Sequence, residues 1–510
     1  MATPIPQNLA AFTAGEVAAA TGGALFEIEP AFPLVGVATD SRTVPAGALF
    51  VAIAGEVHDA HRFAAEVVAR GAVNLVCANR GVRGPRIEVP DTLIALGDLA
   101  RHFVDRETRS RPLPVLAIGG AAGKTTTKTL AAAAVRALFG QTLVTPGNLN
   151  NRIGVPMTLF TLTAEHRAIV LECGTSVPGE IAELGRIARP TVAVVVNVDV
   201  EHSEKLGSLA EIADEEAALL LAARRVAIAN GDDALLKTRL ALAGAQKLTF
   251  GKASGADLAV GPRTVDGSGV QTIVLRTHGR SFAALGGSPR EFRIATHLLG
   301  ETAAMNVAAA VAGALALLDR AASVEELSRL GAAIAGVEAV PGRLHPQTVA
   351  GILVVDDSYN SNPRSVRAAL AAAREVAEHR LNADARLVIA LGDMLELGTQ
   401  AEREHDVLIQ AAEASGADEL LLVGAELARA VRDRRTPLTT PFELFADAHA
   451  AAAVVSSRVS AGDLLLVKGS RGIGMERIIE ALHHEPAGLS PSDLREPIEG
   501  TTETSKGIVR

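Results

Sequence analysis

The chain has 510 residues, too many for a single hydrophobic core, and its length predicts about three domains. Hydrophobic residues make up 48% and charged residues 21%, which excludes a disordered chain and is typical of a globular protein. The net charge of −9 argues against nucleic acid as the main partner, so we expect local basic groups to hold any anionic ligand.

The cysteine content and the apolar stretches predict a compartment. Cys77 and Cys173 are the only cysteines, which excludes a disulfide framework and favours the reducing cytoplasm. No uninterrupted apolar stretch reaches the length of a membrane span, and no basic segment followed by an apolar one opens the chain. We therefore expect a cytoplasmic protein without a membrane span or signal peptide.

The first two-thirds of the chain predict two α/β units. Residues 1–112 mix short apolar runs with turns, and the arginine- and proline-rich segment 106–114 is expected to be a linker. Beyond it, helical segments separate buried apolar strands, which predicts a parallel sheet covered on both faces, with strands at 115–118, 167–172, 191–198 and 225–229. Residues 246–295 alternate in a β pattern and predict a small antiparallel patch.

A second boundary is expected near Pro341-Gly342-Arg343. Strands then recur between helices and predict another open α/β sheet, at 352–356, 386–391, 419–423 and 463–468. The predicted fold class is thus α/β in three domains, at 1–112, 113–340 and 341–485. The polar residues 486–510 are expected to form a flexible tail.

A glycine-rich turn follows the first strand of the central unit. Gly119-Gly120-Ala121-Ala122-Gly123 leads directly into Lys124-Thr125-Thr126 and an alanine-rich helix. Glycines let the backbone approach an anion, the helix amides point at it, Lys124 adds positive charge, and Thr125 offers a hydroxyl to Mg²⁺. An ordinary strand-to-helix turn is the alternative, and the Gly-Lys-Thr-Thr sequence favours a nucleotide phosphate site. The general phosphate-loop motif would have a glycine at position 118, where this chain has Ile118.

Polar residues follow the neighbouring predicted strands, where ligands bind in such sheets. Glu172 and Asn197 lie at strand ends and His202 lies in the next loop. The predicted helix 208–222 then carries Asp214, Glu215 and Glu216. Together these groups predict a site for one or two Mg²⁺ ions, although each alone is typical of a polar loop or a solvated helix face.

Two further segments carry unusual side chains. Residues 147–156 contain three closely spaced asparagines, which suggests a loop of fixed shape. Residues 356–363 contain paired aspartates, the only tyrosine of the chain (Tyr359), and Asn362 before Pro363, which predicts a helix cap.

These segments together resemble the peptidoglycan Mur ligases over nearly the whole chain. The resemblance rests on the Gly-Lys-Thr-Thr loop and on four other motifs: residues 39–42 with 59–61, 148–151 with 154–156, 356–363 with 391–398, and 467–471. The set 148–151 with 154–156 and the set 356–363 with 391–398 are characteristic of the family member that uses D-alanyl-D-alanine. Mur ligases share a shortened phosphate loop, here Gly120–Thr125, which accounts for Ile118.

The resemblance implies a uridine-nucleotide N-terminal domain, a central ATPase domain and a Rossmann-like C-terminal domain that closes over ATP. The implied reaction joins D-alanyl-D-alanine to UDP-N-acetylmuramoyl-tripeptide through an acyl phosphate, in a monomer that uses ATP and Mg²⁺. The implied catalytic and metal residues are Lys124, Thr125, Glu172, His202 and Glu216. The implied ATP contacts are Gly120, Ala121, Ala122, Gly123, Lys124, Thr125, Thr126, Asn306, Arg343 and Asp357. The implied substrate contacts are Asp40, Ser41, Arg42, Asn151, Tyr359, Asn360 and Asn362.

Two departures from the family pattern concern the ligands. The family usually has His-Asn shortly before the adenine-side asparagine, where this chain has Thr302-Ala303 before Asn306. It also places a carbamylated lysine where this chain has Glu216. We hypothesise that Glu216 supplies a carboxylate to a second Mg²⁺ directly, although its side chain is shorter.

Other functions stay open at this point. Another amide ligase of the Mur type, either the one that adds the third peptide residue or a folylpolyglutamate synthetase, shares the phosphate loop, although segment 356–363 argues against both. A catalytically weak paralogue that binds nucleotide as a scaffold belongs to a different class.

Overall fold

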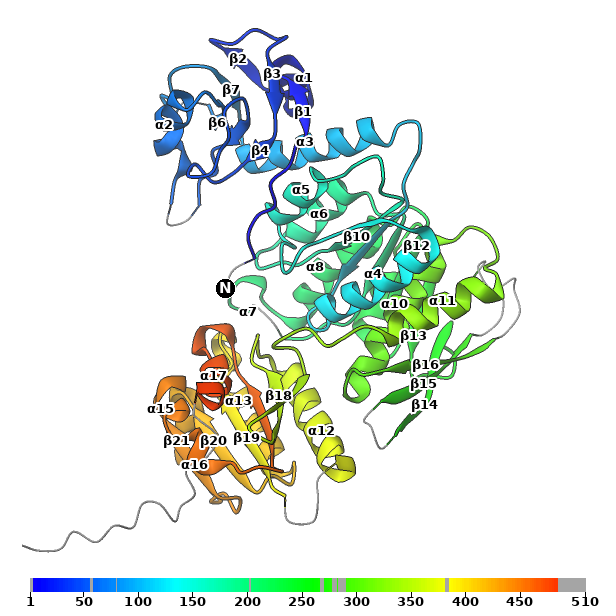
Figure 1. The fold of residues 1–510 in the computed structure, drawn as a ribbon, viewed down its shortest axis with the longest axis vertical. Coiled ribbons are helices and arrows are strands. Elements are labelled where there is room, and N and C mark those ends of the chain that lie inside the picture. The colour runs from blue at the N-terminus through cyan, green and yellow to red at the C-terminus, as the bar shows by residue number, and fades with distance from the viewer. Residues whose placement is uncertain are drawn as a thin grey trace, which may run out of the picture.

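The computed structural model describes residues 3–55, 58–78, 80–200, 203–266, 270–277, 282, 290–380 and 385–484. Figure 1 shows three α/β units in sequence, with the N-terminal unit at one end, the central unit in the middle and the C-terminal unit at the other end. The predicted α/β fold class is confirmed. The predicted tail at 486–510 and His202 lie outside the described residues.

The N-terminal unit is a small mixed sheet with three helices. Its strands lie in the order β2 (Ala24–Phe26), β7 (Arg86–Val89), β6 (Val73–Cys77), β5 (Leu49–Val51) and β4 (Val37–Ala38), beside the pair β1 (Ala11–Thr13) and β3 (Pro33–Val35). The helices are α1 (Ala14–Thr21), α2 (Ala64–Ala69) and α3 (Thr92–Glu107). Asp91 caps α3, accepting from the amides of Leu93 and Ile94. Since α3 continues through Glu107, the predicted linker at 106–114 begins too early.

The central sheet is mostly parallel and ends in an antiparallel patch. Its order is β16 (Glu291–Thr296), β15 (Gln271–Thr277), β14 (Leu258–Val265), β13 (Gln246–Gly251), β12 (Val226–Asn230), β11 (Val192–Val195), β8 (Val115–Gly119), β10 (Ala168–Glu172) and β9 (Thr142–Val144). Neighbouring strands from β9 to β14 run parallel, whereas β14, β15 and β16 pair antiparallel. The antiparallel patch predicted for 246–295 is thus confirmed for β14, β15 and β16 as an extension of the same sheet, whereas β13 at its start is parallel to both neighbours.

Helices cover both faces of this sheet. Buried side chains of one face pack with α5 (Gly154–Leu159), α6 (Glu180–Ala188), α8 (Leu209–Leu221) and α9 (Ala234–Leu240), and α7 (Ser203–Leu206) precedes α8. The other face packs with α4 (Lys124–Phe139), α10 (Gly300–Leu317) and α11 (Val324–Ala335). Of the described helices, α10 alone is long and apolar enough to cross a membrane, but 83% of it is buried inside the protein.

The C-terminal unit repeats the layered plan. Its strand order is β17 (His345–Val349), β18 (Ile352–Asp357), β22 (Leu464–Lys468), β19 (Leu387–Gly392), β20 (Glu419–Val423) and β21 (Phe442–Phe445), and only the β17–β18 pair is antiparallel. One face packs with α12 (Pro363–Arg380), α13 (Ala401–Glu413) and α14 (Ala425–Arg432). The other packs with α15 (Ala448–Ala452), α16 (Val455–Arg458) and α17 (Glu476–His484).

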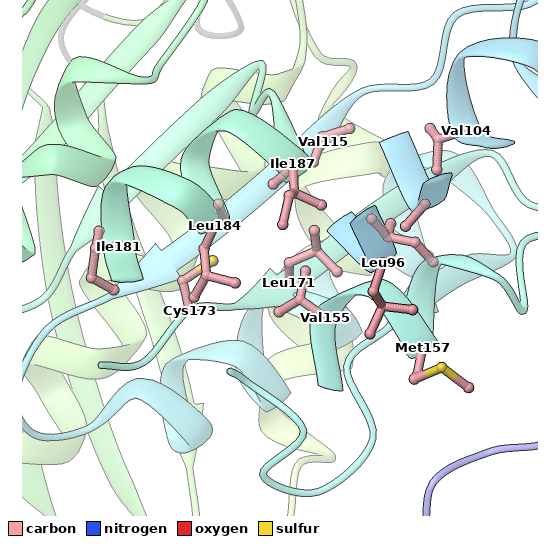
Figure 2. Packing of buried hydrophobic residues seen from close by; sticks show 14 of the residues in the cluster. Leu96, Val104, Val115, Val155, Met157, Leu171, Cys173, Ile181, Leu184 and Ile187 are labelled. Atoms are coloured by element: carbon pink, nitrogen blue, oxygen red, sulfur yellow. The ribbon is translucent and has the colours of Figure 1, made fainter. Parts of the chain in front are cut away.

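The N-terminal and central units share one hydrophobic core. Figure 2 shows Leu96 of α3 among side chains of α5, α6 and β10. Three phenylalanines from β1, α3 and the end of α5 meet with ring centroids 5.7–6.1 Å apart: Phe12, Phe103 and Phe160. At Gly97 the helices approach so closely that a Cβ would lie 2.5 Å from Ile187 Cδ1. This junction is therefore packed as tightly as a domain interior.

The junction between the central and C-terminal units is different. Among the described residues that are buried in the two C-terminal core clusters, Leu299 is the only one before position 341. Arg263 of β14 forms an ion pair with Glu375 of α12. A large cavity, described next, also lies between these two units.

Candidate functional site

A cavity of about 1010 Å³ lies between the central and C-terminal units, and we call it the interdomain pocket. Its central wall contains the end of the phosphate loop (Gly120–Thr125), Glu172 and α10, and its C-terminal wall contains residues 342–344, 357–362 and α12. Both walls lie at the carboxyl ends of parallel strands, where open α/β sheets bind ligands. The carboxyl ends of strands from two sheets thus face the same cavity.

Residues outside the phosphate loop hold it in place by accepting hydrogen bonds from its backbone amides. Gly120 N–H donates to Glu216 Oε2 at 2.7 Å, and the amides of Ala121 and Ala122 donate to Asn197 O and Oδ1 at 3.0 and 2.8 Å. Gly120 has φ +123°, and a Cβ there would lie 3.0 Å from the Asn197 backbone. Only glycine suits that position. Gly120 does not line the interdomain pocket, whereas the residues from Ala121 to Thr126 do.

Lys124 lies at the first turn of α4. Its Nζ donates to Gly120 O at 2.5 Å and to Ala121 O at 3.1 Å, which folds the side chain over the loop. The preceding Gly123 has φ +84°, and a Cβ there would lie 2.5 Å from Asn306 Oδ1. This buried oxygen has no hydrogen-bond partner within the described part of the chain, and Asn306 lines the pocket. Asn306 therefore presents a buried acceptor beside the loop.

Glu172 is the buried carboxylate of the site. Its Oε1 accepts from Thr125 Oγ1 at 3.1 Å and from Asn150 Nδ2 at 2.8 Å, and Lys128 Nζ lies 3.1 Å from its Oε2. Lys128 also donates to Gly147 O at 2.6 Å. Lys128 therefore joins the carboxylate to the asparagine-rich loop.

The donor set at Glu172 fits a magnesium ion. The side chain is 1% exposed, and apart from the ion pair with Lys128 its Oε2 has no hydrogen-bond partner among the described residues. Hard oxygens from one carboxylate and one hydroxyl, completed by phosphate and water, are what Mg²⁺ usually takes in nucleotide sites. The described residues contain no group of three or more His, Cys, Asp or Glu that could hold a metal alone.

The acidic residues of α8 do not converge on Glu172. Asp214 pairs with Arg239 at 2.9 Å, and Glu215 accepts from the amides of Gly179 and Ile181 at the start of α6. The expectation that these two serve a metal is corrected, because the helix turns them toward α6 and α9. Glu216 is 3% exposed and directed at the phosphate loop, but it does not line the interdomain pocket. Its role as a metal ligand stays a prediction.

The C-terminal wall is built around two buried aspartates. Asp356 accepts from Gly342 N at 3.0 Å, and Asp357 accepts from Leu344 N at 3.0 Å and from Lys468 Nζ at 2.6 Å. Burial raises the pKa of Asp357, and Lys468 opposes that rise. These bonds fix the segment that carries Arg343.

Arg343 and Tyr359 form the half-buried part of this wall. The Arg343 guanidinium lies 4.2 Å from the Tyr359 ring centroid, and both residues line the pocket. Asn360 also lines it, and its carbonyl accepts from Lys468 Nζ at 2.9 Å. A planar cation on an aromatic ring presents a flat charged surface to a ligand.

Two predicted substrate asparagines have structural contacts. Asn151 Oδ1 accepts from Ile153 and Gly154 amides at the start of α5, and Asn362 Oδ1 accepts from Ser365 N at the start of α12. The predicted helix cap at Asn362 is confirmed. Both residues also line the interdomain pocket, so capping and ligand contact are compatible.

Asp40, Ser41 and Arg42 lie outside the interdomain pocket, in the N-terminal unit between β4 and β5. Asp40 and Arg42 form an exposed ion pair at 2.7 Å, and Arg70 donates to Ser41 O at 2.7 Å. The structure therefore does not bring this motif together with the phosphate loop.

Four basic residues of the site escaped the sequence reasoning: Lys128, Arg263, Arg364 and Arg367. Lys128 lies one turn after Lys124 on the same helix, and this spacing was a usable signal. Arg263 reaches the pocket from the antiparallel patch, and no local pattern connects that patch with α12.

Comparison with known families matches two segments of the chain. Residues 118–314 match the Mur ligase middle domain, and residues 342–471 match the Mur ligase glutamate ligase domain. The UDP-N-acetylmuramoyl-tripeptide–D-alanyl-D-alanine ligase of Escherichia coli K12 is 35% identical over 457 residues, covering 88% of this chain and 94% of the relative. The enzyme of the same name from Mycobacterium tuberculosis H37Rv is 31% identical, covering 92% and 97%.

Solved structures show the same fold. MurF from Acinetobacter baumannii superposes with a TM-score of 0.81 at 28% identity, covering 94% of this chain and all of that one. MurF from Thermotoga maritima in complex with ADP has a TM-score of 0.72 at 24% identity, covering 88% and 96%.

Proposed function

This chain belongs to the Mur ligase family, and we propose that it joins D-alanyl-D-alanine to UDP-N-acetylmuramoyl-tripeptide at the expense of ATP. The observation that carries the proposal is the interdomain pocket, where the phosphate loop and Glu172 face Arg343, Asp357 and Tyr359 of another sheet. The named relatives that cover nearly the whole chain support the same reaction. The products are the pentapeptide precursor of peptidoglycan, ADP and phosphate, made by a monomer in the cytoplasm.

The reaction has two steps, which activate and then substitute the same carboxyl group. The tripeptide carboxylate attacks the γ-phosphorus of ATP, ADP leaves, and an acyl phosphate forms. The dipeptide amine then attacks the acyl carbon, and the tetrahedral intermediate expels phosphate. Lys124 offsets negative charge on the transferred phosphoryl group, and the C-terminal unit excludes water from the acyl phosphate.

Thr125 and Glu172 are the described residues that would hold Mg²⁺, with His202 as a further proposed ligand. When bound, Mg²⁺ neutralises phosphate charge and orients the γ-phosphoryl group. Lys128 and Asn150 hold the Glu172 carboxylate in place. Glu216 is proposed as the carboxylate that replaces the carbamylated lysine of the family, and its contact with Gly120 N–H gives it a second, competing role.

The remaining predicted contacts divide between the nucleotides and the peptide. ATP is assigned to the loop residues Gly120–Thr126, Asn306, Arg343 and Asp357. The uridine nucleotide is assigned to Asp40, Ser41 and Arg42 of the N-terminal unit. The peptide substrates are assigned to four residues that line the interdomain pocket, Asn151, Tyr359, Asn360 and Asn362. We propose domain boundaries at 112 and 340.

A phosphate-release assay tests the function. The protein is incubated with ATP, Mg²⁺ and UDP-N-acetylmuramoyl-tripeptide, with and without D-alanyl-D-alanine. We expect sustained release only when both substrates are present, with one amide formed per phosphate. Release with another amino-acid acceptor would instead indicate a different amide ligase, and no release with any acceptor would indicate a nucleotide-binding scaffold.

A further inference from the structure

One side of α12 forms a long wall of the interdomain pocket. Its pocket-lining residues recur at helical spacing, from Arg364 and Arg367 in the first turns to Ala371, Glu375 and His379. The two arginines lie three positions apart, so their side chains leave the same face of the helix. The pocket therefore has a doubly basic end beside the start of α12.

Other basic groups of the pocket have partners inside the protein. Lys468 binds Asp357, Arg263 pairs with Glu375, and Arg343 lies on the Tyr359 ring. In contrast, the side chains of Arg364 and Arg367 form no hydrogen bond or ion pair of their own with the residues that the structure describes. Two guanidinium groups near a helix N-terminus repel its positive end, which is unfavourable unless an anion joins them.

A buried hydroxyl lies beside the same helix start. Ser361 is 5% exposed and lines the pocket, and its Oγ has no hydrogen-bond partner within the described part of the chain. A buried hydroxyl without a partner is unfavourable by itself, and a ligand oxygen would satisfy it. Two arginines and one hydroxyl are suitable donors for a carboxylate, which guanidinium groups bind in a bidentate manner.

Asp199, in the loop after β11, is the acidic group that faces these arginines. Burial raises the pKa of its carboxyl, and the nearby charges of Arg367 and Arg364 oppose that rise. Its Oδ2 is buried and has no hydrogen-bond partner among the described residues. Two cations and one carboxylate leave a net charge of about +1, which matches a ligand with one negative charge.

We propose that Arg364, Arg367 and Ser361 form a subsite for the terminal carboxylate of the incoming dipeptide. The inference rests on the proposed function and deepens it. The dipeptide carries a single carboxylate at one end and the reacting amine at the other. With the carboxylate at α12, the amine end lies in the pocket that the phosphate loop and Glu172 line from the opposite wall. The subsite thus selects a free acid and orients its amine.

Two substrates of similar shape that differ by one negative charge test the subsite. We would measure KM and kcat for D-alanyl-D-alanine and for its C-terminal amide, with ATP and the UDP-tripeptide saturating, in the native protein and in Arg364→Gln, Arg367→Gln and the double variant. We expect KM for the dipeptide acid to rise about 10- to 100-fold in each single variant, as for a lost charged hydrogen bond. The preference of the native protein for the acid over the amide should fall toward one in the double variant.

Arg374→Gln is the matched control, because Arg374 lies on the same helix, is exposed, pairs with Glu378 at 2.9 Å and does not line the pocket. It should change neither KM nor the acid-to-amide ratio. Ser361→Ala should raise KM for the acid by a smaller factor than either arginine variant. The KM for the UDP-tripeptide should stay unchanged throughout.

Three results would overturn the proposal. An increase in KM for the UDP-tripeptide alone would assign the arginines to that substrate's carboxylates. An equal loss with acid and amide would indicate a structural role for the arginines. Normal KM values in the double variant would exclude the subsite while leaving the ligase function intact. If the native protein itself failed to use the dipeptide, the proposed function would fail first, and the assignment with it.

Discussion

The central unit has two neighbours and contacts them in different ways. Toward the N-terminal unit it presents α5 and α6, whose apolar side chains merge with those of α3 into one core. Toward the C-terminal unit it presents the phosphate loop, Glu172 and Arg263 around a large cavity. Apolar packing fixes a geometry, whereas a polar, solvent-filled junction permits closure around a ligand. We call the first junction, where apolar packing fixes the position of the N-terminal unit, the platform. We call the second junction, which surrounds the cavity, the working interface.

The largest expected effect concerns the working interface. Lys124→Met removes the charge that we propose offsets the phosphoryl group, so we expect kcat to fall by about 10²- to 10³-fold, as for other lost electrostatic contacts to a transition state. Phosphate release measures it. The thermal midpoint should change little by comparison, because Lys124 is only partly buried. A loss of less than about threefold would contradict the role of Lys124.

The platform is tested by Leu96→Ala, which removes a fully buried side chain from the shared core. We expect the free energy of unfolding to fall by about 2–5 kcal/mol in urea titration. The N-terminal and central units should still unfold in one transition. Leu242→Ala makes the same chemical change at a side chain that is 73% exposed, and it should have almost no effect. Separate transitions for the two units would disprove the shared core.

Variants of Glu216 distinguish between two roles of this residue, which are to hold the phosphate loop in place and to bind a metal ion. If its main role is to accept from Gly120 N–H, Glu216→Gln should keep most activity, because an amide oxygen also accepts, and Glu216→Ala should lower kcat about 10- to 100-fold. If it binds Mg²⁺, Glu216→Gln should be nearly as damaging and should raise the Mg²⁺ concentration needed for half-maximal rate. In both cases removing bicarbonate should leave the native activity unchanged, whereas strong bicarbonate dependence would contradict both.

The smallest effect is expected for the ion pair that crosses the working interface. Arg263 and Glu375 are each about one-fifth exposed, with side-chain values of 22% and 23%. A double-mutant cycle with Arg263→Gln and Glu375→Gln should give a coupling of about 1 kcal/mol or less in urea unfolding. The exposed pair Arg374–Glu378 on the same helix should give a smaller value and serves as the control. A coupling energy larger than the loss of unfolding free energy caused by Leu96→Ala would reverse the contrast between the two junctions.

The sequence predicted the parts of the site that depend on strand order. Glu172 follows a continuous apolar strand, and parallel pairing brings its carboxyl end level with the end of β8, so Glu172 and the phosphate loop are near each other. The same reasoning identified the antiparallel patch and the second sheet. These predictions succeed because hydrophobic periodicity and the ends of strands are local properties of the chain.

The predictions that failed depend on rotation and on contacts between distant elements. Three consecutive acidic residues of α8 leave the helix in different directions, so only one of them can face the loop, and the sequence does not say which. Arg364 and Arg367 resemble solvated helix arginines until α12 is placed against the pocket. His202 lies outside the described residues, so its predicted role stays a prediction.

The shared phenylalanine cluster also limits how such a protein can be recombined. Exchanging the N-terminal unit for another would separate Phe12 and Phe103 from Phe160 and would leave two apolar faces to be matched again. Exchanging the C-terminal unit would disrupt contacts beside the cavity, among them the Arg263–Glu375 pair, the packing of α12 against α10 and the contact at Leu299. A functional chimera is thus more readily joined near residue 341 than near residue 112, and a library of hybrid ligases should place its crossover there.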